Sequence, residues 1–245
     1  MTNLSKTIIV FLLFISHSFA QEKPALNVTF GTDLVSRYIW RGMDLGGNPS
    51  TPQFQPFVNF DFNFACSHTL TLGAWGSYGF TGSYSENDLS IKYTFYKEDF
   101  GTISASVIDF YFPFEKLDFF NYNNDGTGSH IVEMDLAYDG TPDFPIHLLV
   151  ANNLINRVEG DKTLYAEMGY TVNINNYSIY FVVGGANGTS FWNQVNEKGF
   201  KLTNIGVTAS KVVKISDTFS FPVWVSYVVN PHLKTSYVFA KVNLF

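Results

Sequence analysis

The segment from Gln53 to Phe64 reads QFQPFVNFDFNF and alternates between apolar and polar side chains. Phe60 and Phe62 are apolar, while Asn59 and Asp61 beside them are polar. A period of two residues is that of a β-strand, in which successive side chains point to opposite faces. We therefore predict that Phe60 and Phe62 lie on one face of a sheet and that Asn59 and Asp61 lie on the other.

The same alternation recurs from Leu26 to the end of the chain, and no segment after residue 20 shows a sustained helical period. It predicts twelve strands, an even number, with Phe245 as the last residue. The predicted strands cover residues 26–40, 53–64, 69–79, 88–97, 101–112, 130–139, 144–152, 163–173, 177–185, 201–213, 218–229 and 235–245.

The connections between these segments alternate between short and long. Short turns are predicted at residues 65–68, 97–101, 140–143, 174–176 and 214–217. Longer loops are predicted at residues 42–51, 80–87, 113–129, 153–162 and 186–198, with a shorter sixth at 230–234. Outer-membrane barrels have this asymmetry, with short turns in the periplasm and longer loops outside the cell.

The composition agrees with strands that face lipid. Hydrophobic residues make up 46% of the chain and charged residues only 15%, against about 25% charged in ordinary soluble domains. Because lipid cannot hydrogen-bond the backbone, strands cross a membrane only in a closed barrel. We predict an all-β, closed antiparallel transmembrane β-barrel of twelve strands. The alternative is a soluble sandwich or lipocalin-like barrel, but those folds lack the systematic alternation of loop length.

The first 20 residues are predicted to be a signal peptide. Lys6 supplies the positive charge, residues 7–15 are apolar, and Ser18 and Ala20 are the small residues of a cleavage site. Cleavage would leave one domain, residues 21–245, and loss of Lys6 would change the net charge from −6 to −7. We therefore expect export to the outer membrane, and the acidity argues against a nucleic-acid partner. The single cysteine, Cys66, excludes an intramolecular disulfide.

Charged residues of the strands are expected to line the lumen, because Lys or Arg facing lipid at the midplane costs about 2–4 kcal/mol. Arg37 and Arg41 would lie along the polar face of the first strand, and acidic residues of the middle strands would lie on the opposite wall of the barrel. Such charges either close the barrel with ion pairs or line an aqueous path, and the sequence leaves both open. The predicted lumen-lining residues are Asp33, Arg37, Arg41, Asp61, Lys92, Asp109, Glu133, Asp135, His147 and Glu167.

His147 is the best candidate for catalysis. A hairpin that pairs residue 138 with 144 would place Asp135 opposite His147, with Glu167 close on the next strand, but no serine at a matching position completes a triad. Ser129 and His130 are neighbours on a strand and would point to opposite faces. Metal and nucleotide motifs are absent from the sequence. We predict neither an enzyme nor a cofactor.

Three short motifs resemble a known family. They are Ser36-Arg37-Tyr38-Ile39-Trp40-Arg41-Gly42, Pro52-Gln53-Phe54-Gln55 and Asp109-Phe110-Tyr111-Phe112-Pro113, and Glu133 and Glu167 occupy strand positions where that family often carries glutamate. In layout the chain resembles the TorF-type porins, a Gram-negative outer-membrane family, although Arg37 replaces the usual acidic residue. The resemblance implies a porin-like barrel and no particular substrate.

The sequence therefore predicts a monomeric outer-membrane barrel that forms a small, weakly selective pore. Its expected partners are outer-membrane lipids and small solutes or ions. The alternative function is that of a closed barrel, acting as an outer-membrane enzyme or as a structural or surface-recognition protein.

Overall fold

The computed structural model describes residues 25–64, 67–156, 163–187, 199–217 and 219–244. The predicted signal peptide, Cys66 and Phe245 lie outside these residues, as do the centres of the predicted loops at 153–162 and 186–198. No helix in the described ranges is long and apolar enough to span a membrane.

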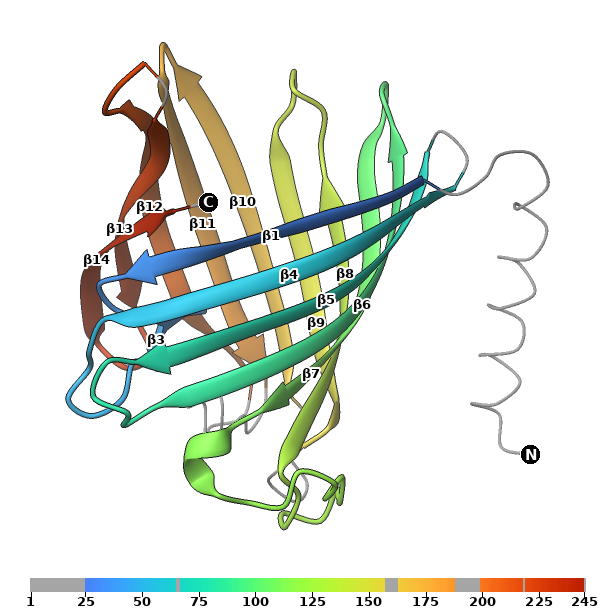
Figure 1. The fold of residues 1–245 in the computed structure, drawn as a ribbon, viewed down its shortest axis with the longest axis vertical. Helices are drawn as coiled ribbons and strands as arrows, with labels where there is room; N and C mark the ends of the chain where they lie inside the picture. Colours follow the sequence, from blue (N-terminus) through green and yellow to red (C-terminus); the bar gives the residue numbers. More distant parts are fainter. Residues whose placement is uncertain (1–24, 65–66, 157–162, 188–198, 218, 245) are drawn as a thin grey trace.

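Twelve long strands close into an antiparallel barrel, which confirms the predicted fold class (Figure 1). Each strand pairs with its neighbours in the chain, and β1 pairs with β14 to close the sheet. The strands are β1 (Ala25–Val35), β4 (Gln53–Phe64), β5 (His68–Gly79), β6 (Ser85–Lys97), β7 (Gly101–Tyr111), β8 (His130–Asp139), β9 (Ile146–Ile155), β10 (Leu164–Ile174), β11 (Tyr177–Asn187), β12 (Phe200–Lys214), β13 (Ser220–Asn230) and β14 (Thr235–Asn243).

The two faces of the barrel wall differ in polarity. One row of directly paired residues, from β1 across to β8, is apolar and exposed on the outside: Val28, Phe60, Leu72, Ile91, Val107 and Met134. The neighbouring row on the same strands points inward and is polar: Asn27, Asp61, Thr71, Lys92, Ser106 and Asp135. The predicted facing of Phe60 and Asp61 is confirmed, and the exterior is the apolar surface that lipid requires.

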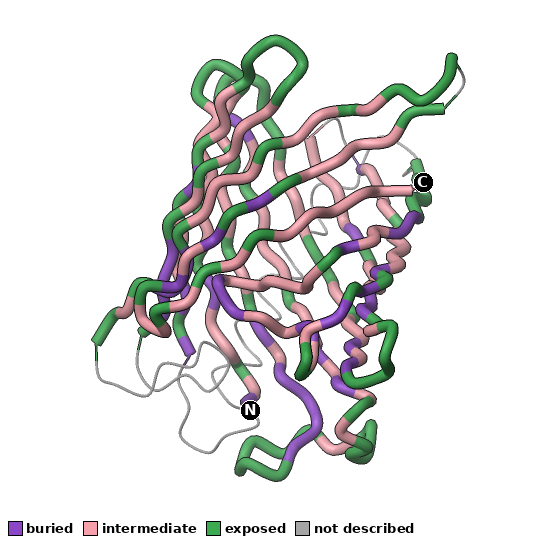
Figure 2. Tube along the Cα trace, turned by 90° about the vertical axis from the view of Figure 1, so that its left-hand side faces the viewer, coloured by how far each residue is buried: buried purple, intermediate pink, exposed green. Residues whose placement is uncertain are grey.

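Short and long connections lie at opposite ends of the barrel, as predicted (Figure 1). We call these the turn end, uppermost in Figure 1, and the loop end, lowest in the view. The loop between β7 and β8 contains a short helix, η1 (Pro113–Glu115). Buried residues gather towards the loop end (Figure 2). The interior is therefore more tightly filled there than at the turn end.

The first strand is shorter than predicted, because β1 ends at Val35 rather than at Trp40. The backbone of Ser36 still bonds Ala240, and its hydroxyl accepts a hydrogen bond from the Ala240 amide at 2.9 Å. After that point the chain leaves the wall and turns back into the lumen. Arg37 and Arg41 therefore do not lie on the polar face of the first strand, and that prediction was wrong.

The seam that closes the barrel is short. Eleven residues of β1 pair with β4, whereas the described ladder between β1 and β14 has three residue pairs, from Asp33 to Val35. Side chains inside the lumen reinforce it, since Asp33 accepts a hydrogen bond from Asn243 at 2.8 Å and pairs with Lys241 at 3.1 Å. Asp33 thus faces inward and helps to hold the two ends of the sheet together.

The facing of β6 can be tested with two adjacent arginine substitutions. Ile91 lies on the apolar exterior, so Ile91→Arg should lower the free energy of unfolding in phospholipid vesicles by about 2–4 kcal/mol. Ser90→Arg is the matched control, because Ser90 points into the lumen and its charge would stay in a polar interior. Urea titrations of both variants measure the difference. A larger loss for Ser90→Arg would invert the assigned faces.

Candidate functional site

The loop between β1 and β4 folds into the barrel and forms the centre of the site. We call residues 36–52 the inward hairpin; it contains the two short strands β2 (Ile39–Trp40) and β3 (Met43–Asp44). Asp44 fixes its tip, because one carboxylate oxygen accepts hydrogen bonds from the Gly46 amide at 3.0 Å and the Ser50 hydroxyl at 2.9 Å. Residues 42–51 were predicted to be an external loop, but Gly42 and Met43 are buried inside the barrel, so the prediction was wrong for the start of this segment.

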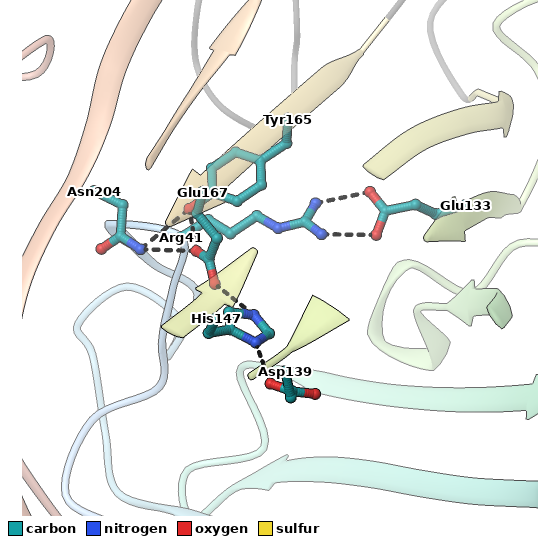
Figure 3. Close-up of polar contacts among 7 residues, drawn as sticks. All are labelled: Arg41, Glu133, Asp139, His147, Tyr165, Glu167 and Asn204. Carbon is teal, nitrogen blue, oxygen red and sulfur yellow. Dashed lines mark hydrogen bonds and ion pairs between the residues drawn. The ribbon is translucent and has the colours of Figure 1, made fainter. Parts of the chain in front are cut away.

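A buried ion pair joins the inward hairpin to the barrel wall (Figure 3). The Arg41 guanidinium donates two hydrogen bonds to the carboxylate of Glu133 on β8, at 2.7 and 3.0 Å. The side chains are only 7% and 2% exposed. A planar guanidinium matches a carboxylate in this two-bond arrangement, which fixes orientation as well as position.

Two aromatic rings hold the same guanidinium from its sides. Its central carbon lies 4.3 Å from the centre of the Trp40 ring and 4.3 Å from that of Tyr165 on β10. Such contacts add cation–π attraction, which is strongest where water is excluded. Tyr165 is itself oriented, because its hydroxyl donates to Glu167 at 2.6 Å and accepts a hydrogen bond from Asn204 at 3.1 Å (Figure 3).

At Gly42 the backbone of the hairpin packs directly against β12 and β13, across the lumen from Glu133. Gly42 has φ +82°, a left-handed conformation that favours glycine, and a Cβ there would lie 1.8 Å from the backbone oxygen of Thr203 on β12. The Asn230 side-chain amide of β13 donates to the Gly42 oxygen at 3.1 Å. Only glycine allows so close an approach of the hairpin backbone to β12.

Aromatic packing holds the hairpin on the remaining side. The Tyr38 ring lies 5.6 Å from that of Trp75 on β5 and 6.0 Å from that of Tyr84, and the Trp40 ring lies 6.0 Å from that of Phe110 on β7. Burial, followed by the nearby Glu86 carboxylate, raises the pKa of both Tyr38 and Tyr84 above the usual range of tyrosine. These phenols therefore stay neutral inside the barrel.

The inward hairpin thus contacts strands all round the barrel, from β5 and β7 through β8 and β10 to β12 and β13. It crosses the lumen at the loop end rather than lining one side. Arg37, which is 39% exposed, pairs within the hairpin with Asp44 at 3.4 Å. Within the segment from Ser36 to Gly42, Tyr38, Trp40, Arg41 and Gly42 make the contacts with the wall, while Ser36 marks the point where the chain turns inward.

Four other predicted residues lie on inward rows of the wall. The Asp61 carboxylate accepts a hydrogen bond from Thr71 at 2.6 Å, and Lys92 is paired with Thr71 in the next ladder. Asp135 lies two residues from Glu133 on β8, and Glu167 faces inward from β10. Among the described residues, no group of three or more His, Cys, Asp or Glu side chains is arranged to hold a metal ion.

The predicted partner of His147 was wrong. The structure pairs His147 with Asp139, at 2.6 Å between Nδ1 and the carboxylate, and pairs Asp135 with Ala151. The turn between β8 and β9 is longer than predicted, because the Gly140 amide donates to the Ile146 oxygen and β9 starts at Ile146 rather than at residue 144. The longer turn shifts the register, so His147 pairs with Asp139. Glu167 does lie near, at 3.7 Å from Nε2 (Figure 3).

Asp109 was wrongly assigned to the lumen. Its ladder partners are Leu89 and Val132, and Leu89 is exposed on the apolar exterior, so Asp109 faces outward. It bonds His130 Nδ1 at 2.7 Å, while His130 Nε2 lies 2.5 Å from the backbone oxygen of Phe119.

The loop between β7 and β8 covers this outward pair. The Tyr122 ring stacks on His130 at 3.9 Å, Phe119 packs edge-on at 5.1 Å, and Tyr122 donates to Asp109 at 2.7 Å. Burial, followed by the bond to Asp109, raises the pKa of Tyr122 to about 12. His130 is fully buried beneath this cover. Phe119 and Tyr122 therefore lie against the outward face of the wall, whereas Phe114 at the start of the loop packs on the ring of Tyr84 at 5.1 Å.

Several residues of the site were not predicted. Tyr165 and Asn204 point into the lumen from β10 and β12. Glu86 and Asp88 lie on β6 and share its inward face with Lys92. The spacing of Glu86, Asp88 and Lys92 was a usable signal, because alternate residues of a strand share a face. Asn230 and Trp75 carried no comparable signal.

No protein-family model matches this chain, and no curated protein matches it. Among solved structures, one reported as "Unveiling the Mechanism Behind the in-meso Crystallization of Membrane Proteins" superposes with a TM-score of 0.50 at 7% identity, over 88% of this chain and 83% of that chain. The translocator domain of autotransporter NalP from Neisseria meningitidis gives a TM-score of 0.36 at 11% identity, over 98% and 94%. The first similarity shows the fold alone, and it is the apolar exterior of the wall that indicates a barrel in a membrane.

Removing Arg41 should destabilise the barrel strongly. Arg41→Ala leaves the Glu133 carboxylate buried without its partner, which should cost about 3–5 kcal/mol of the free energy of unfolding. Replacing both partners, as in Arg41→Met with Glu133→Leu, should restore much of that stability because no lone charge remains. Arg37→Ala is the control and should cost at most about 1 kcal/mol, since its pair is partly exposed. Equal losses for Arg37→Ala and Arg41→Ala in urea titrations would contradict the buried pair.

Removing His130 should loosen the loop between β7 and β8. His130→Ala deletes the bonds to Asp109 and Phe119 and the surface on which Tyr122 stacks. Limited proteolysis of the folded barrel should then cut residues 113–129 at least several times faster, because the loop opens locally. His147→Ala is the control, since His147 faces the lumen on another strand. An unchanged cutting rate in His130→Ala would show that the loop is held by other contacts.

Proposed function

We propose that this chain is an outer-membrane barrel that passes small solutes or ions through a lumen narrowed by the inward hairpin. The observation that carries the proposal is the contrast between the polar inward row, which includes Asp61, Lys92 and Asp135, and the apolar exterior. A polar interior inside a lipid-facing wall is the arrangement of an aqueous channel. The resemblance to the TorF-type porins and the predicted signal peptide support the same assignment.

The inward hairpin would act as the constriction of this channel. Side chains from opposite walls hold it, with Glu133 on one side and Asn230 on the other. Narrow channels select by the charges and hydrogen-bonding groups at their constriction. Since acidic residues outnumber Arg41 around the hairpin, we propose a preference for cations. We propose a monomer whose lipid-facing wall contacts outer-membrane lipids.

Transport is a better proposal than catalysis. The His147 nitrogens face the carboxylates of Asp139 and Glu167, and the His130 nitrogens face Asp109 and a backbone oxygen. Nucleophilic catalysis needs a hydroxyl or thiol within reach of such a base. Within the described residues, no serine, threonine or cysteine side chain is bonded to either histidine.

A closed barrel without conduction is the second candidate. The buried Arg41–Glu133 pair favours it, because breaking such a pair to open the lumen would leave two uncompensated charges. In that case the barrel would serve a structural or surface-recognition role at the loop end. The two candidates differ in one measurable property, the conductance of a single barrel.

Planar bilayer recordings test the proposed channel. The wild-type barrel should show small single-channel currents, and Arg41→Ala should increase the conductance and shift the reversal potential in a salt gradient towards cation selectivity. The reason is that the substitution removes both the anchor of the hairpin and the cation that offsets Glu133. Arg37→Ala serves as the control for a general loss of positive charge, because it leaves the anchor in place. Absence of current from both wild type and Arg41→Ala would favour the closed barrel.

A further inference from the structure

A hollow lies in the lumen beside the inward hairpin and is not explained by the anchor alone. Its volume is about 500 Å³, within the range of small-molecule sites. The inward hairpin contributes Tyr38 and Arg41, and the wall contributes strands from β5 to β12. Its carboxyl groups come from Asp88, Glu133, Asp135 and Glu167. The four acids of the lining therefore face a single guanidinium.

That guanidinium does not neutralise all four acids. The Arg41 guanidinium donates two hydrogen bonds to Glu133, and Glu167 accepts hydrogen bonds from Tyr165 and Asn204. Asp88 and Asp135 are different, because Oδ1 of each is buried and has no hydrogen-bond partner among the described residues. A buried carboxyl oxygen without a hydrogen bond is costly, and a cation in the hollow would lower that cost at both residues.

Aromatic faces form much of the rest of the wall. Tyr38, Trp40, Trp75, Phe110 and Tyr180 all line the hollow. The faces of aromatic rings attract cations, and sites for quaternary ammonium groups are built from them. The Trp40 face is already used by Arg41, whereas the other rings make no contact with a lysine or arginine among the described residues.

The chemistry of the lining favours an organic cation over a metal ion. A metal ion needs several oxygen, nitrogen or sulfur ligands at short distance. The described residues contain no such cluster. An alkylammonium group, in contrast, needs only nearby negative charge and apolar or aromatic surface, and Asp88 with Trp75 directly opposite it in the ladder supplies both.

We propose that this hollow binds a small organic ammonium ion, held by the carboxylates of Asp88 and Asp135 and by the faces of Tyr38 and Trp75. The proposal deepens the proposed function, since it names the class of solute that would pass or dwell at the constriction. The ion occupies the space beside Arg41 rather than replacing it, because the guanidinium remains bonded to Glu133.

Titration calorimetry of the full-length barrel in detergent micelles tests the site. Choline chloride is the probe, and 3,3-dimethylbutan-1-ol, which has the same shape with carbon in place of nitrogen, is the neutral comparison. We expect choline to bind and the neutral alcohol to bind at least tenfold more weakly. Choline should also change the tryptophan fluorescence, because Trp40 and Trp75 line the hollow.

Two substitutions make the test specific to the site. Asp88→Asn should weaken choline binding at least tenfold, and Asp135→Asn should weaken it in the same direction. Asp88→Asn keeps the shape of the side chain and breaks no hydrogen bond at Oδ1, which has no partner among the described residues, so the barrel should still fold. Asp99→Asn makes the same change of charge on the exposed turn after β6 and should leave the affinity unaltered.

The proposal is overturned if the neutral alcohol binds as tightly as choline, or if Asp88→Asn binds choline as wild type does. Neither result depends on conduction, since the measurement needs only the folded barrel. A barrel that binds choline and carries no current would keep the site and refute the channel. A barrel that conducts and fails to bind choline would keep the channel and refute the site.

Discussion

The whole structure depends on the need to pair every backbone amide and carbonyl within the wall. Lipid offers no hydrogen-bonding partner, so a strand-built membrane protein must close on itself. Closure in turn makes each strand show one face to lipid and one to the lumen. The apolar row through Ile91 and the polar row through Lys92 are the direct result, because they are adjacent residues on one strand. Closure therefore separates the two faces, and the alternating sequence makes the lipid face apolar and the lumen polar.

Inside that wall, a buried ion pair joins the inward hairpin to β8. Arg41 and Glu133 are 92 residues apart in the chain, and their contact brings the inward hairpin across the barrel. Removing two charges from water is costly, and their attraction repays that cost only with good geometry and further contacts. The rings of Trp40 and Tyr165 and the tight approach at Gly42 supply those contacts. The charges thus specify position more than they add stability.

Local sequence patterns predicted the strands of the wall well, but they did not predict contacts between residues far apart in the chain. Alternation alone placed most strand boundaries within a few residues, because the period of two is imposed by the pleat. It failed after Val35, where apolar and polar residues continue to alternate although the backbone becomes left-handed at Arg41. The error for Asp109 was avoidable, since Ser104 and Ser106 mark the inward positions of β7 and Asp109 has the opposite parity. The pairing of Arg41 with Glu133 left no trace in the local sequence.

The short seam between β1 and β14 has a consequence for how the barrel assembles. Every other ladder joins strands that are neighbours in the chain, so those hairpins form from local contacts. The seam joins Asp33 to Asn243, which are 210 residues apart, with three described ladder pairs to hold it. The entropy of closing so long a loop must be overcome before these few bonds form. Among the ladders of the barrel, this seam therefore has the largest loop-closure entropy to overcome.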